Sequence, residues 1–278
     1  MCIRDRDDKD GQTPLFIACH QGRVNAARML LDNGAEVDRA RENGQTPLFV
    51  ACEKGLVDAA RLLLDNGAAV DRKNKDGQTP LYAACQNGHV DAARLLLEKG
   101  AAVDRGATEN GATPLLAACA FGHVDAAQLL LDKGAEVDRA NKWGVTPLYV
   151  ACANGHVAVA TLLLDRGAVV DRAAKNGFTP LWIACQNGRV DAARLLLDKG
   201  ADVNRGAQYG RTPLFVACFY DHVDTARLLL TKGAAVDRAD QYDMTPLWIA
   251  CQRGQVDAAR LLLDKGAEVD LAPLTGDP

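Results

Sequence analysis

The chain has 278 residues, of which 48% are hydrophobic and 24% charged, so it holds ample apolar material for a buried core. Its formal net charge of −4 gives no electrostatic reason for general binding to nucleic acid or to an anionic membrane. The sequence contains no run of about 18 apolar residues and no signal-peptide pattern, so we expect no membrane insertion.

Three segments follow one another: a non-repeat lead at residues 1–8, eight repeats of about 33 residues at 9–270, and a C-terminal tail at 271–278. The lead begins MCIRDR and is interpreted either as an artefact, a translated adaptor remnant, or as a short disordered segment. Every repeat contains the triplet Thr-Pro-Leu, and a fixed period of this size predicts one stacked array. The triplets begin at Thr13, Thr46, Thr79, Thr113, Thr146, Thr179, Thr212 and Thr245.

The unit at residues 76–100 shows how each repeat is expected to fold. Thr79 is a good N-cap for a short helix starting at Pro80, because its hydroxyl can accept from a free amide of the first turn. Gly88 favours the backbone that ends this helix, and a second helix is expected from near Val90 to Gly100. The first helix has about two turns and cannot stand alone, so each unit must pack on its neighbours.

The repeated pattern resembles the ankyrin repeat, whose motif is T-P-L-H-x-A at a period of 33. The resemblance covers about Asp8 to Asp270 and implies an all-α solenoid of eight helix-turn-helix units with β-turn or hairpin-like tips. In the family, the His of the motif helps to tie neighbouring loops together by hydrogen bonds. This chain departs from the motif there, so packing is expected to replace that link. The residues in the His position are Phe16, Phe49, Tyr82, Leu116, Tyr149, Trp182, Phe215 and Trp248.

Eight of the nine cysteines occupy one repeat column. Stacked helices lie roughly 8–10 Å apart, which exceeds the limit of about 7 Å between the α-carbons of a disulfide. We therefore expect buried thiols that act as small hydrophobes, and an intracellular, cytoplasmic protein. The column consists of Cys19, Cys52, Cys85, Cys119, Cys152, Cys185, Cys218 and Cys251.

No catalytic motif is present: there is no Gly-rich phosphate loop, no G-x-S-x-G and no H-E-x-x-H. Four of the five His share one column, where they alternate with Arg, Leu and Gln, and such a column is not a metal site. We therefore expect no enzyme activity, no cofactor and no metal. The four are His89, His123, His156 and His222.

A second column carries one Arg in seven of the repeats, and each Arg except Arg205 follows an acidic residue. We interpret this Arg column as local charge neutralisation along a solvated edge. The alternative is a track for an acidic partner or a nucleic acid, which would bind with a steep salt dependence. The column consists of Arg39, Arg72, Arg105, Arg139, Arg172, Arg205 and Arg238.

The variable columns lie at the turn tips and after the Cys of each first helix, and they change character along the chain. They are polar in repeats one to three and become aromatic from repeat four onward, with an Arg among the rings. Exposed aromatic residues with Arg are typical of binding hot spots, although such rings can also pack on adjacent turns. The predicted partner-binding residues are Phe121, Trp143, Val145, Phe178, Tyr209, Arg211, Phe219, Tyr220, Tyr242 and Met244.

These observations favour a non-catalytic scaffold that binds a protein partner on its concave surface and turn tips, mainly in repeats 4–8. The alternative is an ankyrin targeting segment of a longer enzyme or channel whose active part lies outside this chain. Repeats one and eight both keep a full apolar second helix, without the polar outer face that usually caps a solenoid. We therefore expect a longer repeat array or covered ends.

Overall fold

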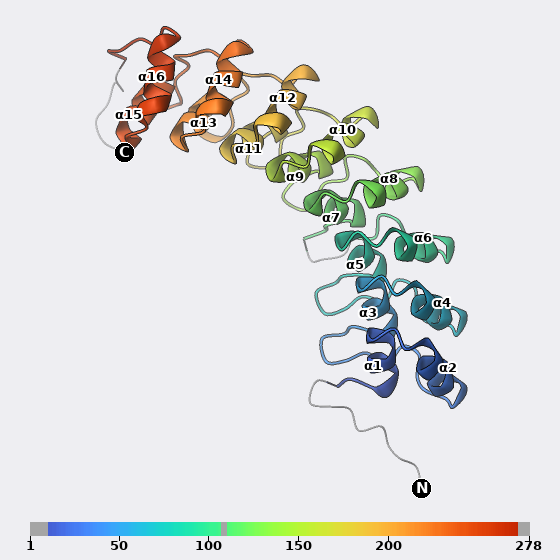
Figure 1. The fold of residues 1–278 in the computed structure, drawn as a ribbon. Helices are drawn as coiled ribbons and strands as arrows, with labels where there is room; N and C mark the ends of the chain where they lie inside the picture. The colour runs from blue at the N-terminus through green and yellow to red at the C-terminus, as the bar shows by residue number, and fades with distance from the viewer. Residues whose placement is uncertain (1–10, 107–109, 272–278) are drawn as a thin grey trace. The chain divides into compact units, whose positions relative to one another are not determined.

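The protein is described by a computed structural model that covers residues 11–106 and 110–271 (Figure 1). It divides into two compact units, Met1–Lys142 and Trp143–Pro278, which we call unit 1 and unit 2 and describe separately. The predicted non-repeat lead at 1–8 lies outside the described residues, and so does the predicted tail apart from Leu271.

Unit 1 is built from antiparallel helix pairs, and each pair packs on the next within the unit (Figure 1). Neighbouring first helices pack on one another, and the second helices form a further layer. Its first helices are α1 (Pro14–His20), α3 (Pro47–Glu53), α5 (Pro80–Gln86) and α7 (Pro114–Phe121). Its second helices are α2 (Val24–Asp32), α4 (Val57–Asp65), α6 (Val90–Glu98) and α8 (Val124–Asp132).

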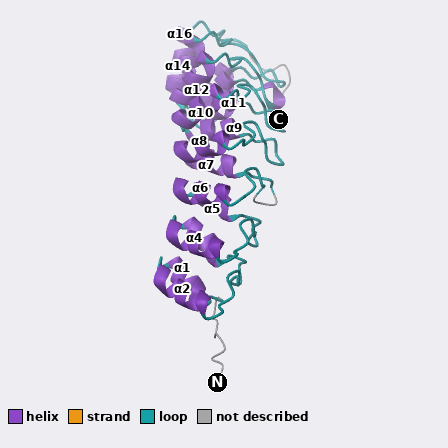
Figure 2. Ribbon diagram, turned by 90° about the vertical axis from the view of Figure 1, so that its right-hand side faces the viewer, coloured by secondary structure: helices purple, strands orange, loops and turns teal. Residues whose placement is uncertain are grey.

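Unit 2 repeats this arrangement with one additional 3₁₀ turn. The turns project on one side of the helices, and the described residues contain no strand (Figure 2). Its first helices are α9 (Pro147–Asn154), α11 (Pro180–Gln186), α13 (Pro213–Phe219) and α15 (Pro246–Arg253). Its second helices are α10 (Val157–Asp165), α12 (Val190–Asp198), α14 (Val223–Thr231) and α16 (Val256–Asp264), and η1 (Gln208–Gly210) precedes α13.

The predicted capping chemistry is present at the start of every first helix. In α5 the Thr79 hydroxyl accepts from the amide of Tyr82 at 3.2 Å, with Pro80 at the first helical position. The cap fixes where the helix begins and satisfies one of its free amides. Gly88 follows the helix with φ +73°, in the left-handed region that its predicted role requires.

The core is formed by the predicted Leu, Ala and Cys columns. Leu81, Ala84 and Cys85 are fully buried between neighbouring repeats. Burial raises the pKa of seven thiols of the Cys column, and the pKa of Cys19 rises to about 12. The prediction fails for Cys251, which is exposed because, among the described residues, α13 is the only first helix that packs on α15.

Main-chain hydrogen bonds join consecutive turns at their tips, in addition to the packing that was expected to replace the link made by the motif His. The amide of Lys75 donates to the carbonyl of Asn43 at 2.9 Å in unit 1, and the amide of Gln241 donates to Tyr209 at 2.8 Å in unit 2. One framework ring also contributes a polar link, because the Trp182 indole N–H donates to the carbonyl of Arg211 at 2.9 Å. These bonds therefore fix the position of each of these turns relative to its neighbour within the unit.

A column of acidic residues provides a second tie between repeats, which the sequence interpretation missed. The Asp104 carboxylate accepts from the amide of Glu136 in the next repeat at 2.9 Å, and Asp171 accepts from Asp202 at 3.0 Å. Asn204 occupies the same column and accepts equally well at 2.9 Å. These residues, interpreted above only as neighbours that neutralise the Arg column, fix the spacing of the repeats.

The His column also links repeats. The His123 ring donates from Nε2 to the carbonyl of Gln86 in the preceding repeat at 3.0 Å. The ring lies so close to Gly88 that a Cβ added there would sit 2.6 Å from its Nδ1. The His in this column therefore satisfies the end of the preceding first helix, which supports the structural interpretation of the column.

Candidate partner-binding surface

Nine of the ten predicted contact residues lie in unit 2, and Phe121 lies in unit 1. The most exposed are Phe121, Trp143, Tyr209, Tyr220 and Tyr242, whose exposed fractions run from 42% to 54%. They are the only exposed aromatic residues of the chain, and all fourteen of its aromatic residues are described. Five of the seven aromatic side chains predicted as contact residues are therefore exposed.

Half-buried residues support these exposed rings in unit 2. Val145, Phe178 and Arg211 lie at the turn tips, and Phe219 lies at the end of α13. Met244 differs from the prediction, because it is buried and its side chain is not available at the surface. Its amide donates to the Asp240 carboxylate at 3.1 Å, which draws the residue into the turn.

The turn tips of repeats six to eight form one connected group, which we call the turn-tip cluster. Phe178 stacks face to face on Trp182, with ring centroids 3.8 Å apart and an interplanar angle of 7°. The Trp182 indole N–H in turn donates a hydrogen bond to the carbonyl of Arg211. The Arg211 guanidinium lies over the rings of Tyr209 and Phe215, at 5.6 and 5.3 Å from their centroids.

Asp240 organises this cluster and was not predicted. Its side chain is fully buried, and Oδ2 accepts from Arg211 Nε at 3.2 Å. Oδ1 accepts from the amides of Tyr242 and Met244 at 2.9 and 3.1 Å, so the carboxylate closes the turn of repeat eight. A turn residue whose side chain accepts from amides further along is characteristic of Asp, and this was the available sequence signal. The charge of Arg211 is compensated internally, so its role in the cluster is mainly one of positioning.

Tyr209 has a backbone conformation that is unusual for a tyrosine. Its φ is +64°, within η1, where a residue with a Cβ is strained. The ring packs against Tyr242 of the next repeat, with centroids 5.8 Å apart and planes tilted by 39°. The strained backbone presents Tyr209 at the tip, where Tyr242 and Arg211 hold it.

A second group lies at the ends of α13 and α15, and we call it the helix-end cluster. Phe219 contacts Tyr220 edge to face at 4.8 Å, and the Arg253 guanidinium lies 4.0 Å from the Phe219 centroid. Tyr220 also stacks on His222 at 6.3 Å. In this cluster Tyr220 is the exposed ring, and Arg253 covers Phe219.

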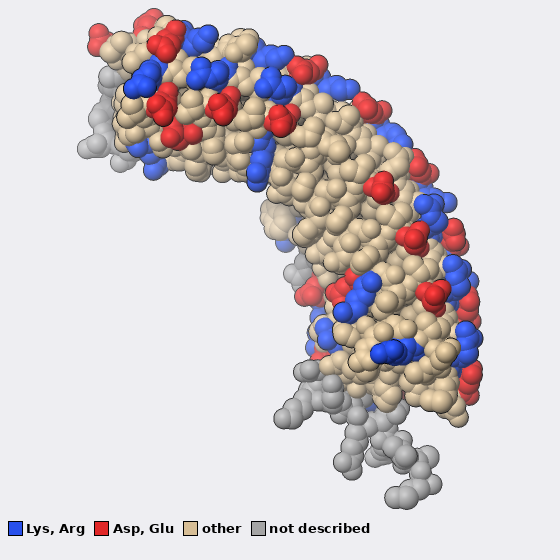
Figure 3. Space-filling view, in the orientation of Figure 1, with Lys and Arg blue, Asp and Glu red and all other residues tan. Residues whose placement is uncertain are grey.

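In unit 1, Phe121 stacks on His123 with ring centroids 6.4 Å apart. Charged residues of both signs alternate along the edge formed by its second helices (Figure 3). In the Arg column, Arg105 lies 3.4 Å from Asp71 and Arg139 lies 3.1 Å from Glu136. These pairs support local charge neutralisation over a track for an acidic partner.

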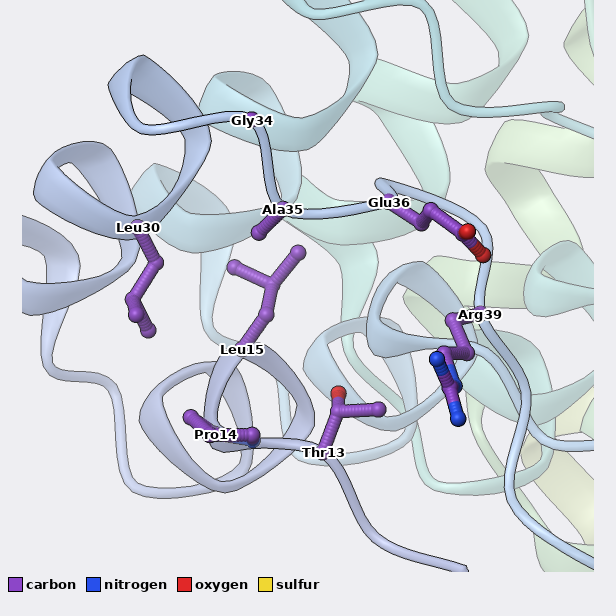
Figure 4. Close-up of a pocket in the computed structure, with 8 residues that line it drawn as sticks. All are labelled: Thr13, Pro14, Leu15, Leu30, Gly34, Ala35, Glu36 and Arg39. Carbon is purple, nitrogen blue, oxygen red and sulfur yellow. The ribbon is translucent and has the colours of Figure 1, made fainter. Parts of the chain in front are cut away.

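A small pocket of about 110 Å³ lies in repeat one, and none of the residues that line it is a predicted contact residue. Leu15, Leu30 and Ala35 point toward one another on one side of it, with Thr13 and Arg39 nearby (Figure 4). Thr13 caps α1 and Leu15 belongs to the core, so the lining is structural. Among the described residues no group of three or more His, Cys, Asp or Glu could hold a metal ion. None of the described helices has the length and apolar character required to cross a membrane.

Comparison with known proteins agrees with this repeat geometry. The family model described as "Ankyrin repeats (3 copies)" matches residues 2–74, 66–141, 134–207 and 203–272, so the chain belongs to the ankyrin-repeat family. The human ASB11 ankyrin repeat domain, known from a crystal structure, is similar in fold with a TM-score of 0.73 and 32% sequence identity. The match covers 81% of this chain and 99% of that one. No match was found among curated proteins. Ankyrin repeats are generally protein-interaction modules, and their fold is typically non-catalytic.

Proposed function

We propose that this chain is a non-catalytic module that binds a protein partner through the exposed aromatic residues of unit 2. The observation that carries the proposal is the distribution of rings. Among the described residues of repeats one to three, every aromatic side chain is buried, whereas Trp143, Tyr209, Tyr220 and Tyr242 are exposed in repeats five to eight. A framework that needs no exposed ring in three repeats does not require them in the others.

The chemistry of these rings suits a protein partner. Tyr and Trp offer a large rigid contact area together with a polar tip, and they are enriched in binding hot spots. Stacking and cation–π contacts hold the turn-tip cluster in place before binding. Such preorganisation lowers the conformational entropy that binding would otherwise cost.

The test is a quantitative crosslinking capture from cell lysate with three forms of the full chain. The first is the unchanged protein, and the second carries Trp143→Ser, Tyr209→Ser, Tyr220→Ser and Tyr242→Ser. The third carries Met29→Ser, a matched control because Met29 is an exposed apolar residue of unit 1. All three must melt alike.

Proteins captured by the first and third forms, but not by the second, would support the proposal. Equal capture by all three would contradict the aromatic surface. The absence of any specifically captured protein would contradict the binding function itself.

A further inference from the structure

Repeat eight carries an apolar face on α15 and α16 that no described residue covers. Cys251, Val256 and Leu263 are exposed, the last two to 64% and 46%, whereas the residues of their columns in the earlier repeats are buried or half-buried. These three residues and Ala259 form what we call the C-terminal face, and they line an open groove of about 440 Å³. Because α16 has the same nine residues as α4 and α12, VDAARLLLD, this face repeats one that the next repeat covers inside the array.

Repeat one exposes the opposite half of such a contact. Pro14 and Met29 are exposed, although the residues of their columns in repeats two to eight are buried or half-buried. Met29 is 59% exposed, whereas Leu62 in the same column is 6% exposed. Four of the five residues of this face line an open groove of about 430 Å³. We call it the N-terminal face, and it consists of Pro14, Ile17, Ala26, Met29 and Leu30.

The two faces match as the two sides of an internal repeat contact. A terminal repeat normally presents a polar outer face, but both end repeats here keep the apolar residues with which neighbouring repeats pack on one another. Ile17 has the residue type of Ile249, which is buried in repeat eight, and Met29 replaces the usual Leu by a side chain of similar volume. The N-terminal face therefore has the composition needed to cover the C-terminal face of another copy.

The Gly that ends each first helix provides a more specific match. A Cβ added at Gly155 would lie 3.1 Å from Cδ of Arg189 in the next repeat, and the Nε–H of Arg189 donates to the carbonyl of Ala153 at 3.3 Å. Gly254 holds the position of Gly155 in repeat eight, and no described atom would lie within 4 Å of a Cβ added there. Arg23 holds the position of Arg189 in repeat one, so a second copy supplies the side chain that packs against this Gly inside the array.

The acceptor column at the end of each repeat provides a second match. Asp237 of repeat seven accepts from the amide of Glu268 in repeat eight at 3.2 Å. Asp270 is the next member of this column, and it is exposed. Glu36 holds the position of Glu268 in repeat one, so its amide is the donor that a second copy brings to Asp270. Polar groups therefore match at the two ends as well as apolar ones.

A contact between like faces fits less well. Two C-terminal faces placed together would bury the same apolar residues, but they would contain neither Arg23 nor the amide of Glu36. Each Asp270 carboxylate would then lose water without gaining its amide donor, which is unfavourable.

We propose that the chain associates end to end with a second copy: the N-terminal face of one copy packs on the C-terminal face of the other and continues the repeat stack. The contact is heterologous, so each pair keeps one open face of each kind and can add further copies. This inference goes beyond the proposed function, because it uses no residue of the turn-tip or helix-end cluster.

The test measures the mass of the full chain by sedimentation velocity across roughly a hundredfold range of concentration. One end variant carries Val256→Lys and Leu263→Lys on the C-terminal face, and the other carries Ile17→Lys and Met29→Lys on the N-terminal face. The single substitutions Leu263→Lys and Met29→Lys, at exposed positions, give the same comparison with less risk to the fold.

The control variant carries Trp143→Lys and Tyr220→Lys. It adds the same charge at exposed residues of repeats five and seven, which belong to neither end face. Every variant must keep the circular dichroism spectrum of the unchanged protein.

We expect the mass of the unchanged protein and of the control to rise with concentration. Each end variant should associate with itself at least about tenfold more weakly. An equimolar mixture of the two end variants should form pairs that contain one chain of each and nothing larger, because only one matched contact remains between them.

An unchanged protein that stays monomeric across the range would overturn the inference. Association of the N-terminal-face variant with itself would also overturn it, because that result indicates a contact between like faces, and so would a mixture of end variants that stays monomeric. Loss of association in the control would place the contact at the aromatic residues instead. The proposed function has its own readout, the aromatic-dependent capture of other proteins, so either idea can fail without the other.

Discussion

Asp240 provides the sharpest test of how the turn-tip cluster is held together. Substitution by Ala removes the acceptor for the amides of Tyr242 and Met244 and the partner of Arg211. The Met244 amide is buried, and leaving such a donor unpaired costs about 1–3 kcal/mol. A third of the Arg211 side chain is exposed, so water replaces its lost partner and adds less than about 1 kcal/mol. We expect Asp240→Ala to lower the free energy of unfolding by roughly 1–4 kcal/mol.

Asp240→Asn is the matched control. Its amide oxygen can still accept from both backbone amides, as Asn74 does in its own turn, where Oδ1 accepts from Gln78 at 2.8 Å. The charge opposite Arg211 and the acceptor for its Nε–H are lost, but the Arg211 side chain is one-third exposed and water can replace its partner, so the expected cost is below about 1 kcal/mol.

The assay must read the turn locally, because a repeat array does not always unfold as a single two-state system. Hydrogen exchange of the Met244 amide reports the bond directly, and urea unfolding followed by circular dichroism gives the overall loss. The Ala variant should exchange at least about tenfold faster than the Asn variant. Equal exchange in the two variants would show that the carboxylate does not hold the turn, and the account of the cluster would fail.

Three further predictions concern the ties between repeats. Burial raises the pKa of Asp104, so the stability that this residue contributes is greatest when it is protonated and falls as the pH rises through that pKa. Asp104→Asn should therefore raise the midpoint of thermal unfolding at pH 7, and the difference from the unchanged protein should disappear at acid pH. A lower midpoint for the variant at pH 7 would contradict the assignment. In a Cys2→Ser background, Cys251 should react with a thiol reagent in the native state before the seven buried thiols, and uniform labelling would refute the burial of the column. Gly88→Asp should lower the free energy of unfolding by about 2–3 kcal/mol, because it strains the backbone and displaces His123. Urea unfolding should show that adding His123→Gln recovers part of this loss. Strictly additive effects of the two substitutions would refute the contact between Gly88 and His123.

The local elements of the fold could be predicted because their signals are local. Thr at the N-cap, Pro after it and Gly past the helix end act within a few residues of each other, and the helices begin where these signals place them. The fixed period then predicted the stacking of the repeats, because a short amphipathic helix can bury its apolar face only against the neighbouring repeat.

The candidate surface could be predicted only in part, because exposure depends on contacts between distant residues. The five exposed rings were identified from their columns, but Met244 and Arg211 were both assigned without knowledge of Asp240. Asp240 lies 29 residues after Arg211, and their pairing follows only once adjacent turns are stacked. The carboxylate of Asp104 was likewise assigned to a solvated edge, because its amide partner lies 32 residues away.

Backbone strain in the described residues gathers beside the exposed rings of the C-terminal repeats. The non-glycine residues with left-handed φ there are Tyr209, Asp221 and Asp243, at +64°, +59° and +59°. One is itself an exposed ring, and the others directly neighbour Tyr220 and Tyr242. The two Asp replace framework glycines, and Asp tolerates this conformation better than most residues. Each of these left-handed residues still costs about 1–2 kcal/mol relative to a relaxed backbone. In the other repeats, Gly occupies the positions of Asp221 and Asp243, and Asn or Asp is common at the position of Tyr209. Strain that is kept where a relaxed residue is available in the same column is typical of functional surfaces, and it supports repeats seven and eight as part of the contact.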